Sequence, residues 1–125
     1  MNSLQNKTTS IVNHIKIGDF NKAETDVKKL IKKYPEIPYL YYLCGASLDG
    51  QNKFDDSIQV YKTAIKLKPD YFEVYFNMGN LFLKNKMAEK AIINYKKTLV
   101  LKPDHIEAYI MLGNAFKYLK KFKEA

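Results

Sequence analysis

Few side chains in this 125-residue sequence could carry out chemistry, and those few are scattered. The two histidines, His14 and His105, have no evident carboxylate or cysteine partner for metal binding or nucleophilic catalysis. Asp55 and Asp56 come at the start of a predicted helix, where the helix dipole favours negative charge. The segment Met78–Asn80 lies inside a predicted helix, whereas a phosphate-binding loop would lie between a strand and a helix. We therefore expect no enzyme, no metal site and no cofactor.

The net charge of +8 is the feature that could suggest nucleic acid, because clustered cations gain affinity for phosphates through counterion release. All 21 basic residues are lysines, however, and guanidinium is the group suited to bidentate phosphate or guanine contacts. The joint abundance of Lys, Asn, Ile and Tyr is typical of genome-wide codon bias. We interpret the charge as a solvated face and do not expect nucleic acid as the partner.

The elements that must position any binding residues show up as a repeat with a period of 34 residues. Such a period indicates stacked supersecondary units, none of which can bury its apolar face alone. The block Leu67–Asp70 returns as Leu101–Asp104. The other recurring positions are Pro35, Pro69 and Pro103; Tyr41, Tyr75 and Tyr109; and Gly45, Gly79 and Gly113.

Apolar residues at helical spacing predict two helices in each unit, separated by turns and ended by prolines. The sequence predicts an all-α solenoid of antiparallel helix-turn-helix pairs, with about seven helices. Turns are expected at residues 18–19, 50–52 and 85–86 and near Lys120. The predicted units are a degenerate first repeat at 4–37, repeats at 38–71 and 72–105, and a truncated fourth repeat at 106–125, which form a single array.

Two further expectations follow from the repeat. Cys44 shares its position with Met78 and Leu112, so we interpret it as a small core residue. The N-terminus has no cationic start followed by an apolar run, and no window is as long as a membrane span, so we expect a cytoplasmic protein. Ala125 falls at the start of a unit's second helix, which predicts an N-terminal fragment of a longer, bacterial chain.

These positions resemble the tetratricopeptide repeat, whose 34-residue helix-turn-helix unit carries an aromatic residue, Leu-Gly and Tyr on its first helix and Ala, an aromatic residue, Ala and Pro on its second. The third unit matches closely, and the first departs from the pattern at Lys7, Ser10, Ile11 and His14. The matching residues of the third unit are Tyr75, Met78, Gly79, Phe82, Ala91, Tyr95 and Pro103.

The resemblance implies that the first helices of successive units line a concave groove for an extended peptide or a helix of another protein. The candidate groove residues are Tyr39, Tyr42 and Leu43 in the second unit, Phe76, Asn77, Asn80 and Lys84 in the third, and Ile110, Met111, Asn114 and Lys117 in the fourth. Asparagine amides can hydrogen-bond the main chain of an extended peptide whatever its side chains. Phe76, Asn77 and Asn80 would be the first residues to mutate.

One version of this groove, found in chaperone cofactors, holds a C-terminal carboxylate with Lys, Arg and Asn side chains. The corresponding positions here are Thr8, Val12, Leu43, Glu73 and Asn77, of which Asn77 alone could serve. We therefore do not expect a carboxylate clamp.

The leading hypothesis is a protein-interaction module that binds a peptide or protein segment in an apolar groove containing asparagines. One alternative is the substrate-presenting region of a larger transferase, either a sulfotransferase or a glycosyltransferase. Another is a self-associating scaffold, in which an uncovered fourth repeat exposes Tyr109, Leu112 and Phe116 and makes a homo-oligomer.

Overall fold

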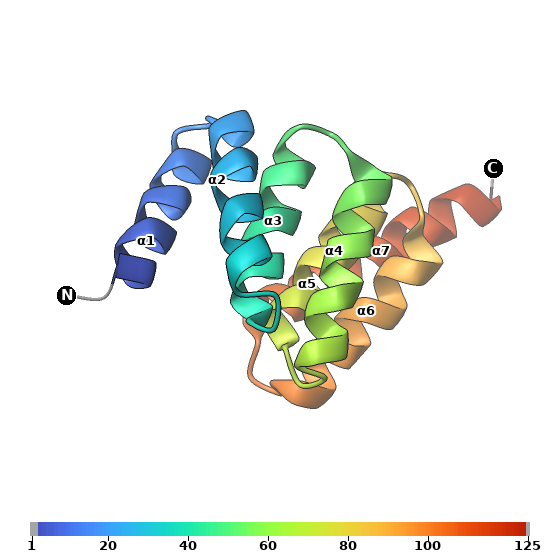
Figure 1. Cartoon of the computed structure of the whole chain (residues 1–125). Helices are drawn as coiled ribbons and strands as arrows, with labels where there is room; N and C mark the ends of the chain where they lie inside the picture. The colour runs from blue at the N-terminus through green and yellow to red at the C-terminus, as the bar shows by residue number, and fades with distance from the viewer. Residues whose placement is uncertain (1–2, 125) are drawn as a thin grey trace. The chain divides into compact units, whose positions relative to one another are not determined.

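The computed structural model describes residues 3–124 of the chain, and within that range it contains seven α-helices and no strand (Figure 1). The prediction of an all-α protein is therefore confirmed. No described helix is long and apolar enough to cross a membrane. The helices are α1 (Ser3–Lys16), α2 (Phe20–Lys33), α3 (Pro38–Gly50), α4 (Phe54–Leu67), α5 (Phe72–Lys84), α6 (Ala88–Leu101) and α7 (Ile106–Glu124).

The chain divides into two compact units, which are described separately here as unit 1 (Met1–Pro69) and unit 2 (Asp70–Ala125). In unit 1, α3 packs against both α2 and α4, and α1 packs against α2 and α3 (Figure 1). Burial of one apolar stripe from each of α1, α2 and α3 makes the core. Its buried members are Ile11, Ala23, Val27, Leu30, Leu40, Leu43, Cys44 and Leu48.

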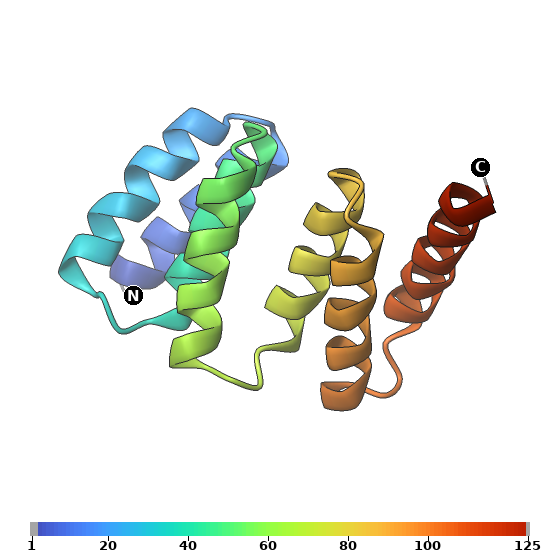
Figure 2. The same cartoon turned by 90° about the vertical axis from the view of Figure 1, so that its right-hand side faces the viewer.

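In unit 2, α6 packs against both α5 and α7, and α5 also contacts α7 (Figure 2). Small buried residues let α7 approach the other two helices, because both Ala108 and Ala115 are fully buried on the side that it turns toward them. The buried side chains on α5 and α6 are Val74, Met78, Leu81, Phe82, Ala88, Ala91, Ile92, Tyr95 and Thr98.

The paired helices of each unit are held close by a glycine that faces a tyrosine ring. A Cβ added to Gly79 on α5 would lie 2.6 Å from Cε1 of Tyr95 on α6, and one added to Gly45 on α3 would overlap the ring of Tyr61 on α4. The sequence-based reason for a glycine inside these helices, close packing against an aromatic residue of the partner helix, is thus confirmed. Added bulk at either glycine would overpack the contact.

The predicted turns form where one residue adopts a left-handed backbone conformation. Gly18, Asn52 and Lys86 have φ values of 84°, 59° and 64°, and they are 34 residues apart along the chain. The next position in this series is Lys120, where we expected a fourth turn. That expectation is wrong, because α7 continues as a helix through Lys120 to Glu124. Ala125 lies outside the described residues.

The physical reason lies in the sequence and in the missing contacts. Each of the three observed turns is followed by a second helix that packs against the first, and this packing offsets the cost of the left-handed residue. No such helix follows α7 within the described residues, so Lys120 and its neighbours keep the helical conformation that lysine and leucine favour.

Two smaller expectations have different outcomes. Cys44 is buried, and burial raises the pKa of its thiol to about 11, so it is the core residue that the repeat predicts. Ile17 was expected on the apolar stripe of the first helix, but it is exposed and lies in the turn after α1. α1 ends at Lys16, and the left-handed Gly18 then turns the chain away from the core.

Candidate functional site

Unit 2 brings eight of the predicted groove residues onto two helices that contact each other, α5 and α7. We call this set the α5/α7 face. Helical spacing explains the grouping, because residues separated by three or four positions lie on one side of a helix. Four members are partly buried, namely Phe76, Asn77, Asn80 and Met111; the other four, Lys84, Ile110, Asn114 and Lys117, are exposed.

Phe76 lies where the two helices meet, and its ring packs against His105 at the start of α7. The two ring centroids are 4.6 Å apart, and His105 also lies edge-on to Phe72, with centroids 5.9 Å apart. Nδ1 of His105 accepts a hydrogen bond from the backbone N–H of Ala108, at 3.0 Å, which caps the first turn of α7. His105 therefore joins α5 to α7 at one end of the face.

The role of His105 was missed in the sequence, where it was considered only as a possible metal ligand or catalytic group. A usable signal was present. His105 lies 34 and 68 residues after Tyr71 and Ile37, and these residues immediately precede the first helices of their units. A side chain that can accept a hydrogen bond at such a position satisfies one of the unpaired N–H groups of a helix start.

Asn80 is oriented by a hydrogen bond from the second helix of its own repeat. The hydroxyl of Tyr95 donates to Oδ1 of Asn80 at 2.6 Å. Burial raises the pKa of Tyr95 above its usual value, so its hydroxyl stays protonated and can donate at neutral pH. Because Oδ1 accepts this bond, the NH2 group of Asn80 is the part of the amide that can donate to a ligand.

The α7 side of the face is more exposed than the α5 side. Ile110 is 58% exposed, and Asn114 and Lys117 are also exposed. The side-chain amide of Asn114 lies 3.7 Å from the sulfur of Met111 and can donate a weak hydrogen bond to it. α7 thus contributes apolar surface and a second amide to the face.

The three groove candidates of unit 1 have different environments. Tyr39 and Tyr42 on α3 stack with ring centroids 6.1 Å apart, and Tyr39 is exposed. Leu43 is only 3% exposed and belongs to the core, so the expectation that it faces a groove needs correction. α1 packs against α3 in this unit, and Val12 of α1 contacts the same core, which leaves Leu43 no surface for a ligand.

The expectation that His14 has no carboxylate partner also needs correction. Nδ1 of His14 is 4.0 Å from Oδ2 of Asp19, because the left-handed Gly18 brings the chain back toward the end of α1. This separation is longer than a hydrogen bond, and Nδ1 has no hydrogen-bond partner in the structure. Within the described residues no group of three potential ligands is arranged to hold a metal ion.

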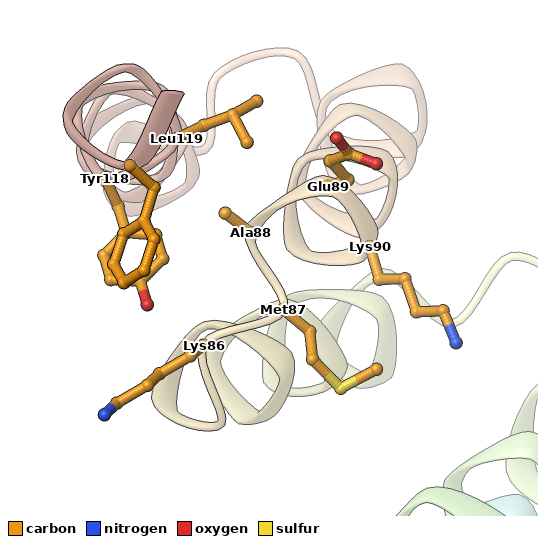
Figure 3. Close-up of a pocket in the computed structure, with 8 residues that line it drawn as sticks. Lys86, Met87, Ala88, Glu89, Lys90, Tyr118 and Leu119 are labelled. Atoms are coloured by element: carbon orange, nitrogen blue, oxygen red, sulfur yellow. The ribbon is translucent and has the colours of Figure 1, made fainter. Parts of the chain in front are cut away.

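A separate cleft of about 450 Å³ lies where the end of α7 passes the turn between α5 and α6 (Figure 3). Its apolar wall includes Met87, Ala88, Leu119 and the rings of Tyr118 and Phe122, whose centroids are 4.7 Å apart. Lys86, Glu89 and Lys90 surround it. Sequence reasoning missed this cleft because it depends on α7 continuing past Lys120, where a turn was expected.

Two family models match the chain. A model described as a TPR repeat matches residues 50–86, and one described as a tetratricopeptide repeat matches residues 72–105. No curated protein sequence matches.

Several solved structures are similar to this chain. A crystal structure of MamA has 26% sequence identity and a TM-score of 0.84, and the match covers 98% of this chain and 75% of that one. The first TPR domain of the human RPAP3 protein, solved by NMR, has 20% identity and a TM-score of 0.89, covering 95% and 94%. The first TPR of Spaghetti (RPAP3), bound to the HSP90 peptide SRMEEVD, has 21% identity and a TM-score of 0.85, covering 91% and 90%.

The matches agree with the observations made on the chain itself. The helix-turn-helix pairs, the glycine-to-tyrosine contacts between paired helices and the left-handed residues 34 positions apart are all features of one repeating unit. The chain is therefore a member of the tetratricopeptide repeat family, with the all-α helical-repeat fold that its period predicts.

Proposed function

We propose that the chain is a protein-interaction module and that the α5/α7 face of unit 2 binds an extended segment of a partner protein. The observation that carries the proposal is the combination of partly buried apolar rings and oriented amides on two adjacent helices. Phe76 supplies the ring, and Asn80, held by Tyr95, supplies the amide. The solved TPR domain with a bound peptide supports protein or peptide partners as a class.

The polar groups of the face favour main-chain recognition. An extended peptide presents an unpaired carbonyl and N–H at every residue, and an asparagine amide can accept one and donate to the other. Asn77, Asn80 and Asn114 are the amides on the face. Such contacts contribute affinity without selecting side chains, so selectivity would come from how the ligand's apolar residues fit Phe76, Ile110 and Met111.

The charges of the face are sorted along its helices. Glu73 and Glu107 lie in the first turns of α5 and α7, whereas Lys84 is in the last turn of α5 and Lys117 is past the middle of α7. A terminal carboxylate would be repelled at the acidic end, which agrees with the absence of clamp residues expected from the sequence. We therefore propose an internal, extended segment with apolar residues as the ligand.

Peptides selected from a random display library on the immobilised full chain provide the test. For a selected peptide, Asn77→Ala should raise the dissociation constant about fivefold or more, since a lost interface contact of this kind costs about 1 kcal/mol. Asn94→Ala is the matched control, because Asn94 is also a partly buried asparagine but lies on α6, where its amide donates to the carbonyl of Lys90. Equal effects of the two substitutions, or selection of no peptide, would count against the proposal.

A further inference from the structure

A second binding surface lies on another side of α7, away from the α5/α7 face. The evidence begins with the two helix pairs already described. In each pair the glycine of the first helix receives a tyrosine of the second, and a small, fully buried residue precedes that tyrosine by four positions. Ser57 precedes Tyr61 in α4, and Ala91 precedes Tyr95 in α6. The hydroxyl of Ser57 also donates to the backbone carbonyl of Gly45 at 2.8 Å.

Gly113 holds the equivalent position on α7, but no ring lies over it. A Cβ added to Gly113 would have no heavy atom within 4 Å outside its own helix and chain neighbours. Phe116, three residues on, is 46% exposed, although its equivalents Leu48 and Phe82 are 2% and 7% exposed. We call this surface the Gly113 face; its residues are Tyr109, Leu112, Gly113 and Phe116.

The Gly113 face is already formed in the absence of a partner. The hydroxyl of Tyr109 donates to the carbonyl of Pro103 at 3.1 Å, as Tyr41 does to Pro35 at 2.7 Å, so the Tyr109 ring is held in place. Lys96 of α6 lies 5.7 Å from the centroid of the Phe116 ring. The face therefore presents ordered apolar surface beside a glycine with space for a ring.

Charge complementarity specifies the direction and the first turn of the missing helix. The last turns of α7 carry Lys117, Lys121 and Lys123, all exposed. In both observed pairs the helix that packs on the glycine runs antiparallel and begins with acidic residues, Asp55 and Asp56 in α4 and Glu89 in α6. An acidic first turn placed over the lysines of α7 would gain favourable charge contacts, and it would also suit the dipole of the incoming helix.

We propose that the Gly113 face binds an amphipathic helix of a partner protein that begins with an acidic turn and then carries a small residue followed, four positions later, by an aromatic residue. The aromatic ring packs on Gly113 and covers Tyr109 and Phe116. This goes beyond binding at the α5/α7 face, because it uses a different side of α7 and a helical ligand.

A second copy of this chain is a poorer occupant, although the sequence made self-association an alternative. Among the described helices, α4 and α6 alone have Ser or Ala followed four residues later by Tyr. Both tyrosines are already buried on their own glycines, so a second copy would have to open one of its own helix pairs before it could bind.

A synthetic peptide with the sequence of α4, residues 54–67, is a suitable probe because it has the full pattern. A 14-residue helix is marginal in water, so a lactam bridge between positions 62 and 66, both exposed in α4, holds it helical. Titration into the full ¹⁵N-labelled chain should shift the amide signals of Tyr109, Gly113 and Phe116. Tyr61→Ala in the peptide should weaken binding at least about tenfold, because the ring that packs on the glycine is lost.

Gly113→Leu in the chain should also weaken binding at least about tenfold, since its side chain fills the space for the ring. The variant should melt at or above the wild-type temperature because nothing lies within 4 Å of the new Cβ, which separates lost binding from lost folding. Lys121→Leu, which adds the same side chain elsewhere on α7, should change the dissociation constant by less than about threefold.

Three results would overturn the proposal. One is the lack of any shift at millimolar concentrations of the bridged peptide, and another is a set of shifts on α3 around Gly45, which would show exchange with the chain's own α4. The third is a wild-type dimer in light scattering that Gly113→Leu converts to a monomer, because a second copy would then be the occupant.

Discussion

The ring of Tyr95 lies directly over Gly79, so that an added Cβ would be 2.6 Å from Cε1 and 2.7 Å from Cδ1 of the tyrosine. Tyr95 is fully buried, and its hydroxyl is bonded to Asn80, so the ring cannot move aside without losing that contact. One glycine therefore determines both how closely α5 and α6 pack and how an amide of the α5/α7 face is oriented.

Alanine at Gly79 and at Gly113 should change stability in opposite directions. Gly79→Ala should lower the free energy of unfolding by about 1–3 kcal/mol through overpacking against Tyr95. Gly113→Ala should raise it by up to about 1 kcal/mol, because alanine is the better helix former and nothing lies close to the new Cβ. Denaturant unfolding of the two variants beside the wild type measures both effects. An unchanged midpoint for Gly79→Ala would contradict the packing described here.

Glycine at Lys86 and at Lys120 provides a second pair of opposite effects at equivalent repeat positions. Lys86 is exposed and has a φ of 64°, so Lys86→Gly should stabilise the chain by about 0.5–1 kcal/mol by relieving the left-handed conformation. Lys120→Gly should instead reduce the helical signal in circular dichroism, because α7 is helical at that position. A rise in stability for both variants would show that Lys120 forms a turn in solution.

Glu24 should make unit 1 sensitive to acid. Its carboxylate accepts a hydrogen bond from Gln51 at 2.8 Å and forms ion pairs with Lys28 and, at 3.4 Å, with Lys53, so it connects α2 to the residues that flank α3 and α4. The hydrogen bond from Lys28 is the main cause of a pKa lowered to about 2. The stabilisation is therefore complete above the ordinary carboxyl pKa and is lost as the pH falls toward 2.

Glu24→Gln should lower the free energy of unfolding by about 1–2 kcal/mol at neutral pH and flatten its pH dependence between about pH 2 and 5. Urea unfolding at several pH values measures this difference. Glu36→Gln is the control, because Glu36 is exposed between α2 and α3. If both variants keep the wild-type pH dependence, the Glu24 cluster does not stabilise the native state.

Much of the fold could be predicted from the sequence because each repeat states its own contacts. Residues 34 positions apart identified the paired helices, and the predicted ranges of the second and fourth helices, 20–33 and 54–67, match α2 and α4. Lys120 was mistaken for a turn residue because its position was assigned by analogy with Asn52 and Lys86, whereas the conformation of such a residue depends on a helix that packs after it. A single-unit pattern does not contain that tertiary contact.

The candidate site could be predicted less well, because membership of a helix face does not determine exposure. Leu43 lies on the predicted face of α3, yet α1 packs against that helix and leaves Leu43 buried. His105 showed the opposite error. It was set aside because it had no catalytic partner, but its ring position beside Phe76 depends on the approach of α7 to α5, which becomes visible only in three dimensions.

Chemical-shift mapping of a library-selected peptide on the ¹⁵N-labelled full chain tests most directly whether the α5/α7 face is the binding site. We predict that the largest amide shifts fall on Phe76, Asn77, Asn80, Met111 and Asn114, and that Ile110→Ala weakens binding while Ile93→Ala does not, although Ile93 on α6 is even more exposed at 66%. Shifts that cluster around Ile93 on α6, with the α5/α7 face unchanged, would contradict the proposed function.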